Sequence, residues 1–303
     1  MSGMSGFSAE WLALREPVDA ASRNAELTAR LLDWQQTLDH LSVLDLGSGT
    51  GANYRFLAPR LSGDPHWRLV DHDPVLLMQN DAFKSCSVER HCLDLAGDWA
   101  LLDFQGVQLV TASALIDLVA AEWLERLARR CWEAQATVLI VLSYDGVISW
   151  QPVLEGDESV REWVNRHQRT NKGFGPALGP LAAPALKTML ESVGYRVELR
   201  SSPWELAPEQ VVMQTALLEG WIVAVREIAP DTTDWLGAWA MQRRDLIERG
   251  HSRLHVGHWD LLATVTSNQT THLGPSHSDG RVDAGSGTNL QSLAGSRQAA
   301  LSR

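Results

Sequence analysis

Residues 43–61 read VLDLGSGTGANYRFLAPRL, and this stretch decides the fold of the N-terminal half of the chain. Its apolar start predicts a buried strand, and the apolar residues after the glycines recur at helical spacing. Between the two lie Gly47, Gly49 and Gly51. A strand, glycine turn and helix in this order bring a nucleotide-like ligand onto bare backbone at a helix N-terminus. Glycine suits the turn because a Cβ would hold the ligand away and disfavour positive φ.

Composition sets the class of protein. The chain has 303 residues, 45% of them hydrophobic and 21% charged, which is enough for one or two domains with a substantial core. The net charge of -11 argues against nucleic acid as a partner. Cys86, Cys92 and Cys131 have no metal-binding spacing, so we expect no metal and a reducing, cytoplasmic setting. We find no membrane span and no signal-peptide pattern.

Strand and helix patterns alternate as far as residue 144. Four further strands are expected at 67–70, 88–93, 106–112 and 136–144, with helices between them. This alternation predicts a doubly wound, mostly parallel α/β sheet.

A helical leader, residues 1–40, precedes the first strand. We expect two helices on either side of Pro17 and a position over the ligand cleft. Its charged residues Arg15, Glu16 and Arg23 are expected to be solvated.

The second half of the chain departs from the alternation. Residues 145–180 are expected to hold one short helix and a Gly/Pro-rich loop, whose length suggests function. The patterns then predict a helix at 184–193, a strand at 195–200, helices at about 208–228 and 232–249, and a last strand within RLHVGHWDLLATV. Residues 267–303 have the composition of a disordered tail.

Two groups in the last predicted helix need an assignment. Arg243, Arg244 and Arg249 are expected to form its solvated face. Trp235 and Trp239, four residues apart, are expected to belong to the core rather than to a stacking platform.

Acidic residues recur at three strand tips. Asp45 precedes the glycines, Asp71 lies 20 residues after Gly51, and Asp94 with Leu95 follows the third strand. With the sequence Asp45-Leu-Gly-Ser-Gly-Thr-Gly, these positions resemble the class I S-adenosylmethionine-dependent methyltransferases. The resemblance implies a Rossmann-like sheet of seven strands whose last strand runs antiparallel. Such a domain would span residues 41–266, with insertions at about 145–180 and 204–249, the second a helical insertion before the last strand.

The resemblance also implies roles for single residues in binding S-adenosyl-L-methionine, whose product is S-adenosyl-L-homocysteine. The glycines and Ser48 would pass beneath the methionine part, near Asp45. Asp71 would hold the ribose hydroxyls, a role that its distance from the glycines also supports. His72 would pack beside the adenine, which Asp94 and the Leu95 backbone would read. Ser113 would line the methionine end.

Two other interpretations stay open. GSGTGA also fits a loose dinucleotide fingerprint, and Asp71 lies where NAD would need a carboxylate. Against an NAD-dependent oxidoreductase stand Asp45, Asp94 and the lack of a hydride-transfer constellation. A non-catalytic S-adenosylmethionine-binding regulator or partner subunit is the second alternative.

The methyl acceptor is less well defined. Tyr144 and Asp145 end the fifth strand, where catalytic groups are expected, and His167 is a further candidate base. Arg169 and Lys172 are candidates to bind an anionic group of the substrate. The leader and the extra helices favour a covered site for a small molecule, with no nucleic acid and no membrane as partner.

Overall fold

The strand that begins the glycine motif is central to a mixed sheet in the computed structural model, which describes residues 8–79 and 87–265. The strand order is β3-β2-β1-β4-β5-β8-β6, and β7 pairs with β8. Five strands run parallel: β1 Ser42–Leu46, β2 His66–Asp71, β3 Val88–Cys92, β4 Leu109–Ser113 and β5 Thr137–Gln151. The other three are β6 Tyr195–Ser201, β7 Trp204–Leu206 and β8 Arg253–Val265. The expected tail, residues 267–303, and Cys86 lie outside the described residues.

The direction of β8 confirms a central expectation. β8 is antiparallel to both β5 and β6 and lies between them. The predicted strands are all present, so the doubly wound, mostly parallel sheet with an antiparallel last strand is confirmed. β7 adds an eighth strand. The sequence did not predict it, because a strand of three residues is too short to show a periodic pattern.

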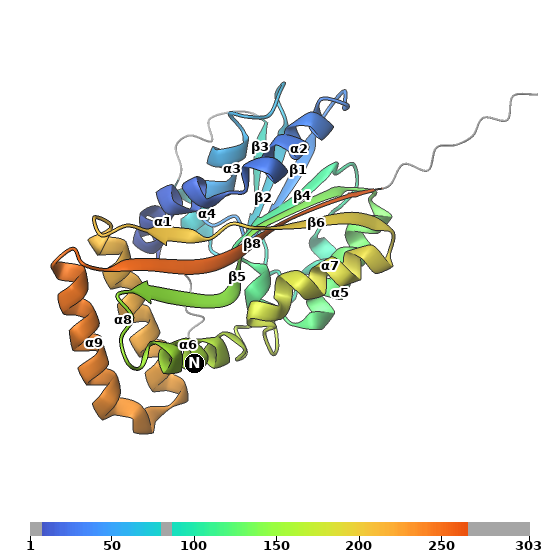
Figure 1. Cartoon of the computed structure of the whole chain (residues 1–303). Helices are drawn as coiled ribbons and strands as arrows, with labels where there is room; N and C mark the ends of the chain where they lie inside the picture. The colour runs from blue at the N-terminus through green and yellow to red at the C-terminus, as the bar shows by residue number, and fades with distance from the viewer. Residues whose placement is uncertain (1–7, 80–86, 266–303) are drawn as a thin grey trace, which may run out of the picture. The chain divides into compact units, whose positions relative to one another are not determined.

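Helices cover both faces of the sheet (Figure 1). On one face, α5 and α7 pack with the strands in one hydrophobic cluster; on the other, α2, α3 and α4 pack in a second cluster. Their bounds are α2 Ala25–Gln35, α3 Ala52–Leu57, α4 Pro74–Met78, α5 Ala121–Glu133 and α7 Ala182–Ser192. Within the described residues, no helix combines the length and apolar character needed to cross a membrane.

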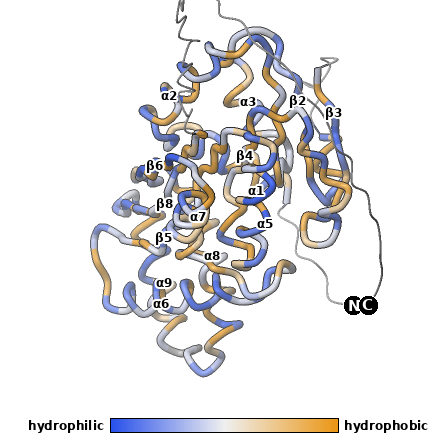
Figure 2. Tube along the Cα trace, turned by 90° about the vertical axis from the view of Figure 1, so that its right-hand side faces the viewer, coloured by the Kyte–Doolittle hydropathy of each residue, from blue (hydrophilic) through white to orange (hydrophobic). Residues whose placement is uncertain are grey.

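A further hydrophobic cluster forms where β5 and β8 continue past the parallel strands (Figure 1). These extensions and β7 pack against α6 Asp157–Gln168, α8 Val211–Ile228 and α9 Thr233–Glu248. Trp150 on β5 meets Trp221 and Trp239 edge-on, with ring centroids 5.3 and 5.7 Å apart. Figure 2 shows hydrophobic segments in the parallel sheet, at β2 and β4, and again in the further cluster, at α8. Much of the high tryptophan content therefore belongs to this further cluster, formed by β5, β7, β8, α6, α8 and α9.

The extension of β5 corrects the expected loop at residues 145–151. Burial alternates along it, with Ile148 and Trp150 buried and Val147 and Ser149 exposed, as in a strand with one face on a core. Its sequence DGVISWQ hides this pattern because Gly146 and the polar residues resemble a turn.

The leader also differs from the expectation. Helix α1, Ala9–Ser22, runs through Pro17 without a break, and the chain turns instead at Arg23 and Asn24. The Asn24 side chain accepts a hydrogen bond from the Leu27 N–H at 3.0 Å and so caps α2. A good N-cap with an anchored backbone therefore decides where the helix ends, rather than the proline.

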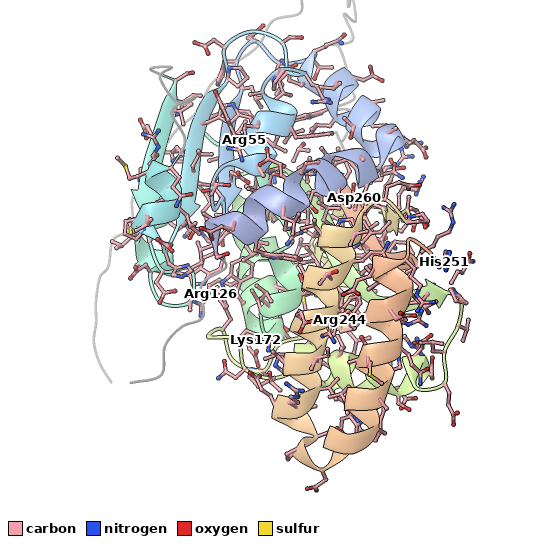
Figure 3. The ribbon with its side chains drawn as sticks, turned by 90° about the vertical axis from the view of Figure 1, so that its left-hand side faces the viewer. Arg55, Arg126, Lys172, Arg244, His251 and Asp260 are labelled. Atoms are coloured by element: carbon pink, nitrogen blue, oxygen red, sulfur yellow. The ribbon has the colours of Figure 1, made fainter. Side chains whose placement is uncertain are left out.

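Asp260 on β8 provides that anchor (Figure 3). Its Oδ2 accepts the Asn24 N–H at 2.8 Å, and its Oδ1 accepts the Leu142 N–H at 2.8 Å and the Ser202 hydroxyl at 2.7 Å. Leu142 has φ +55°, in the left-handed region, and lies within a register shift between β5 and β8. One buried carboxylate thus joins the leader, the fifth strand and the segment after β6.

The arginines of α9 do not share one solvated face. Arg243 is fully buried, and its Nε donates to Asp157 Oδ1 at 3.1 Å while its Nη2 donates to Asp157 Oδ2. Its Nη1 donates to the Pro152 carbonyl at 2.8 Å. Arg249 is exposed, as expected, and the Arg244 side chain is 39% exposed. Trp239 is buried, whereas Trp235 remains 37% exposed.

We predict that Arg243→Met strongly destabilises the protein. The substitution leaves the buried carboxylate of Asp157 without its cation, and breaking a buried pair in this way costs about 3–5 kcal/mol. Arg244→Met is the matched control, because its exposed pair with Glu219 is worth about 0–1 kcal/mol. Urea denaturation of both variants measures the difference, and equal small effects would contradict the prediction.

Candidate functional site

The glycine turn lies at the carboxyl end of β1, enclosed by two apolar side chains. Gly47 has φ +63° and Gly49 has φ +51°, a region that side chains other than glycine's disfavour. A Cβ on Gly47 would lie 3.1 Å from Leu115 Cδ1, and one on Gly49 would lie 3.2 Å from Leu12 Cδ1. Leu12 belongs to α1, so the leader passes directly over the turn.

The tip of β2 is tied to this turn. Asp71 is buried, and its Oδ2 accepts the Gly49 N–H at 2.8 Å. Its Oδ1 accepts the Asp73 N–H at 3.0 Å and lies 3.3 Å from His72 Nδ1. Asp73 caps α4 through its own carboxylate, as expected, with Val75 N–H at 2.8 Å. The structure therefore brings Asp71 and His72 to the glycine turn.

Asp45 heads a buried polar chain that the sequence did not reveal. Asn53 Nδ2 donates to Asp45 Oδ1 at 2.9 Å and to Thr111 Oγ1 at 3.0 Å. Arg23 Nη2 in turn donates to Asn53 Oδ1 at 2.8 Å. Burial raises the pKa of Asp45 to about 7, although the Asn53 hydrogen bond and the charge of Arg23 oppose the shift. The sequence held one signal for this chain of hydrogen bonds, which is the amide side chain of Asn53 in the first helical turn after the glycines.

The tip of β3 is more open. Asp94 is exposed, and its Oδ1 accepts the Ala96 N–H at 2.9 Å. The Leu95 carbonyl accepts a hydrogen bond from Trp123 Nε1 at 2.8 Å, so that oxygen is already engaged within the fold. Because β1, β2 and β3 are parallel and in register, Asp45, Asp71 and Asp94 lie along one edge of the sheet.

Ser113 at the end of β4 lies in a cleft between α1 and α3. The cleft has a volume of about 160 Å³. Its walls are formed by the side chains of Glu16, Asp19, Ala20, Arg23, Ala52, Arg55, Phe56, Arg60 and Ser113. In Figure 3, Arg55 lies on α3 beside α1, which crosses in front of the strands.

The leader charges facing this region are partly buried and paired, rather than fully solvated as expected. Arg15 and Asp19 form an ion pair at 2.8 Å in which each side chain is only 11% exposed. Glu16 binds Arg55 through both carboxylate oxygens, at 2.6 and 2.5 Å. Arg15 and Asp19 are four residues apart on α1, a spacing that the sequence shows. The Glu16–Arg55 pair joins α1 to α3, so it depends on the packing of the whole fold and could not be found from the sequence.

Several buried polar atoms at this edge have no hydrogen-bond partner within the described part of the chain. They include Asp45 Oδ2, Ser48 Oγ, Asp117 Oδ1 and Ser143 Oγ. Burial also raises the pKa of Asp117, to about 6. A polar, positively charged ligand beside a bare glycine backbone fits these residues. By contrast, residues 8–79 and 87–265 contain no His, Cys, Asp and Glu cluster that could hold a metal ion.

The expected acceptor residues fall into two places. Tyr144 is buried and donates from its hydroxyl to Asn165 Oδ1 at 2.8 Å, and burial raises its pKa, so the phenol stays protonated at neutral pH. Asp145 Oδ1 accepts the Val147 N–H at 2.8 Å, and burial raises the pKa of this carboxylate.

The second place is the end of α6. His167 Nε2 lies 2.8 Å from Glu227 Oε2, and Lys172 Nζ lies 3.3 Å from His167 Nδ1. Arg169, at the helix C-cap, is exposed. Asn165 and His167 are two residues apart on α6, about 200° around the helix. Tyr144, which is bonded to Asn165, therefore lies on a different side of α6 from the His167 side chain. Their roles in catalysis and those of Arg169 and Lys172 in binding remain predictions.

Comparison with known proteins gives similarities in structure only; no family model and no curated protein sequence matches the chain. Phosphoethanolamine N-methyltransferase 2 from Haemonchus contortus, in complex with S-adenosyl-L-methionine, is 14% identical with a TM-score of 0.46, over 88% of this chain and 60% of that one. The YcgJ protein from Bacillus subtilis is 13% identical with a TM-score of 0.47, over 80% and 99%.

A third similar structure is an S-adenosylmethionine-dependent methyltransferase from Thiobacillus denitrificans in complex with S-adenosyl-L-homocysteine. It is 14% identical with a TM-score of 0.43, over 84% of this chain and 98% of that one. The chain spans only 52% and 60% of the lengths of the two Haemonchus contortus structures that it matches.

We predict that Asp45→Asn removes a pH dependence of folding. The pKa of Asp45 is about 7 in the folded chain, and an unfolded aspartate titrates at about 3.9. The folded state therefore binds the extra proton, and this stabilisation is present below the unfolded pKa and lost as pH rises through the folded pKa.

Urea denaturation at several pH values tests this expectation. Between about pH 5 and pH 7, the free energy of unfolding of Asp45→Asn should rise by about 2 kcal/mol relative to the wild type. Asp73→Asn removes the half-buried carboxylate that caps α4 and is the matched control for the loss of one acidic group. A constant difference between Asp45→Asn and the wild type would contradict the raised pKa.

Proposed function

We propose that this protein is a class I S-adenosylmethionine-dependent methyltransferase acting on a small molecule. The observation that carries the proposal is the antiparallel β8 between β5 and β6, in a sheet whose β1 leads into the glycine turn. The family that the sequence resembles has this strand arrangement. In this chain the three acidic strand tips, Asp45, Asp71 and Asp94, lie along the edge of the sheet where the cofactor is expected.

The same strand order counts against an NAD-dependent oxidoreductase. Dinucleotide-binding sheets of the doubly wound type have the order 3-2-1-4-5-6 with parallel strands. Here an antiparallel strand separates β5 from β6. The acidic residue before the glycines supports the same choice, because a buried carboxylate suits a cationic ligand better than a pyrophosphate.

Binding of S-adenosylmethionine is assigned to the residues of this edge. Gly47, Ser48, Gly49 and Gly51 would give it a bare backbone, and Asp71 would accept its ribose hydroxyls. His72, Asp94 and Leu95 would surround the adenine, with Ser113 at the methionine end. When bound, the cofactor supplies an electrophilic methyl group on a sulfonium.

The protein's own contribution to methyl transfer is positioning. In-line displacement needs the acceptor aligned with the methyl group and shielded from water. Leu12 and Leu115 close the glycine turn from two sides, which supports a cover formed by the leader, residues 1–40. The insertions at about 145–180 and 204–249, which contain α6, α8 and α9, would enclose the acceptor.

Proton transfer from the acceptor is assigned to residues of β5 and α6. His167 remains the candidate base, because a histidine can accept a proton near neutral pH. Tyr144 would act by hydrogen bonding, since its phenol stays protonated. Asp145, within β5, would assist, and Arg169 and Lys172 would bind an anionic group. The free cysteines Cys92 and Cys131 support a reducing, cytoplasmic setting.

Calorimetry tests the cofactor. We expect S-adenosyl-L-homocysteine to bind and NAD not to bind. Asp71→Ala should weaken binding about 10-fold or more, because each hydrogen bond to a charged acceptor contributes about 1.5–3 kcal/mol. Asp73→Ala is the control, since it removes a neighbouring carboxylate that caps α4. NAD binding by the wild type, or an Asp71→Ala variant as tight as wild type, would refute the assignment.

Radiolabelled methyl transfer to a metabolite extract tests for catalysis. An enzyme should place label from S-adenosylmethionine on a small molecule, and the product identifies the acceptor. Cofactor binding without labelled product in every extract would favour the non-catalytic binding protein instead.

A further inference from the structure

The cleft between α1 and α3 carries an excess of positive charge. Of the five charged side chains that line it, Glu16 and Arg55 neutralise each other, and Asp19 is held by Arg15 at 2.8 and 3.2 Å. The two that remain are Arg23 and Arg60. Within residues 8–79 and 87–265, neither forms an ion pair with a carboxylate. The cleft therefore favours an anion.

Arg23 is the better placed of the two. One nitrogen, Nη2, donates to Asn53 Oδ1 at 2.8 Å, whereas Nε is buried with no hydrogen-bond partner in the part of the chain described. Its guanidinium lies 4.9 Å from the centre of the Phe56 ring. Burial lowers the pKa of Arg23, and nearby carboxylates only partly oppose this shift. An anion in the cleft would offset the penalty for the charged guanidinium.

Arg60 follows α3 in the chain and lies against Phe56 of that helix. Its guanidinium lies 4.0 Å from the centre of the Phe56 ring and donates to the Phe56 carbonyl. Arg60 adds positive charge at the cleft, but its Nη1 already donates a hydrogen bond to the backbone carbonyl of Phe56. Arg23 is therefore the expected direct partner of an anion.

The cleft is connected to the site of methyl transfer. Ser113, at the end of β4, and Ala52, in the first turn of α3, form part of its wall. Asn53 links Arg23 to Asp45 at the end of β1. An anionic group in the cleft would thus lie beside the glycine turn, where the family resemblance puts the methionine end of the cofactor.

We propose that the α1–α3 cleft binds the carboxylate at the amino-acid end of S-adenosylmethionine, with Arg23 from the leader as its direct partner. This inference rests on the proposed function and deepens it. It assigns the leader a part in cofactor binding in addition to covering the cleft. Arg23 presents planar donors that match a carboxylate, a geometry that a lysine could not reproduce.

Two ligands separate the halves of the cofactor. S-adenosyl-L-homocysteine has the amino-acid end, whereas 5′-methylthioadenosine retains the adenosine and the thioether but lacks that end. We expect the wild type to bind both, and Arg23→Gln to weaken S-adenosyl-L-homocysteine about 10- to 100-fold by calorimetry, the range for losing a charge-assisted hydrogen bond. The affinity for 5′-methylthioadenosine should not change, which also shows that the adenosine half remains folded.

Arg30→Gln is the matched control. Arg30 is an α2 arginine that pairs with Glu26 and Glu198 outside the cleft, so its loss removes the same charge without touching the site. Both ligands should bind this variant as they bind the wild type. Arg23→Lys should recover only part of the lost affinity.

Each contrary result has its own meaning. If Arg23→Gln weakens both ligands equally, Arg23 supports the fold and the assignment is overturned. If it weakens neither, the carboxylate is bound elsewhere and the cleft serves the acceptor or another anion. If the wild type binds neither ligand, the proposed function itself fails, and the assignment of the cleft fails with it.

Discussion

The buried carboxylate of Asp260 is the interaction on which the rest of the structure depends. It accepts hydrogen bonds from three segments that are distant in sequence, at Asn24, Leu142 and Ser202. Burial raises the pKa of Asp260, while these three donors and the charge of Arg23 favour the ionised form. A buried carboxylate is tolerated only when its oxygens are satisfied in this way. Asp260 therefore fixes the leader, β5 and β8 in one arrangement.

The position of the leader follows from that arrangement. With Asn24 held against β8, α1 must cross the carboxyl edge of the sheet, and this direction puts Leu12 over Gly49 and Arg23 beside Asn53. The conformation of Leu142 and the register shift between β5 and β8 are both explained by Asp260. Leu142 adopts a left-handed φ because its N–H must reach the carboxylate, and the register between β5 and β8 shifts there.

The fold and the cofactor edge could be predicted because their signals are local. The glycines, the acid before them and the alternation of strands and helices each depend on a few neighbouring residues. The extension of β5, the burial of Arg243 and the continuity of α1 through Pro17 could not be predicted. Each depends on a partner far along the chain: α8 and α9 for β5, Asp157 for Arg243, and Asp260 for the end of α1.

The sequence by itself determined the mostly parallel character of the sheet, the glycine turn and the three acidic strand tips, because backbone conformation and hydrophobic periodicity are encoded residue by residue. Only the tertiary structure decided which charges are solvated and which are enclosed. Arg15, Arg23 and Arg243 resemble ordinary surface charges of amphipathic helices in the sequence. Arg243 becomes buried, and Arg15 and Arg23 partly buried, because the helices that carry them pack against other segments, and that packing exists only once the whole domain has folded.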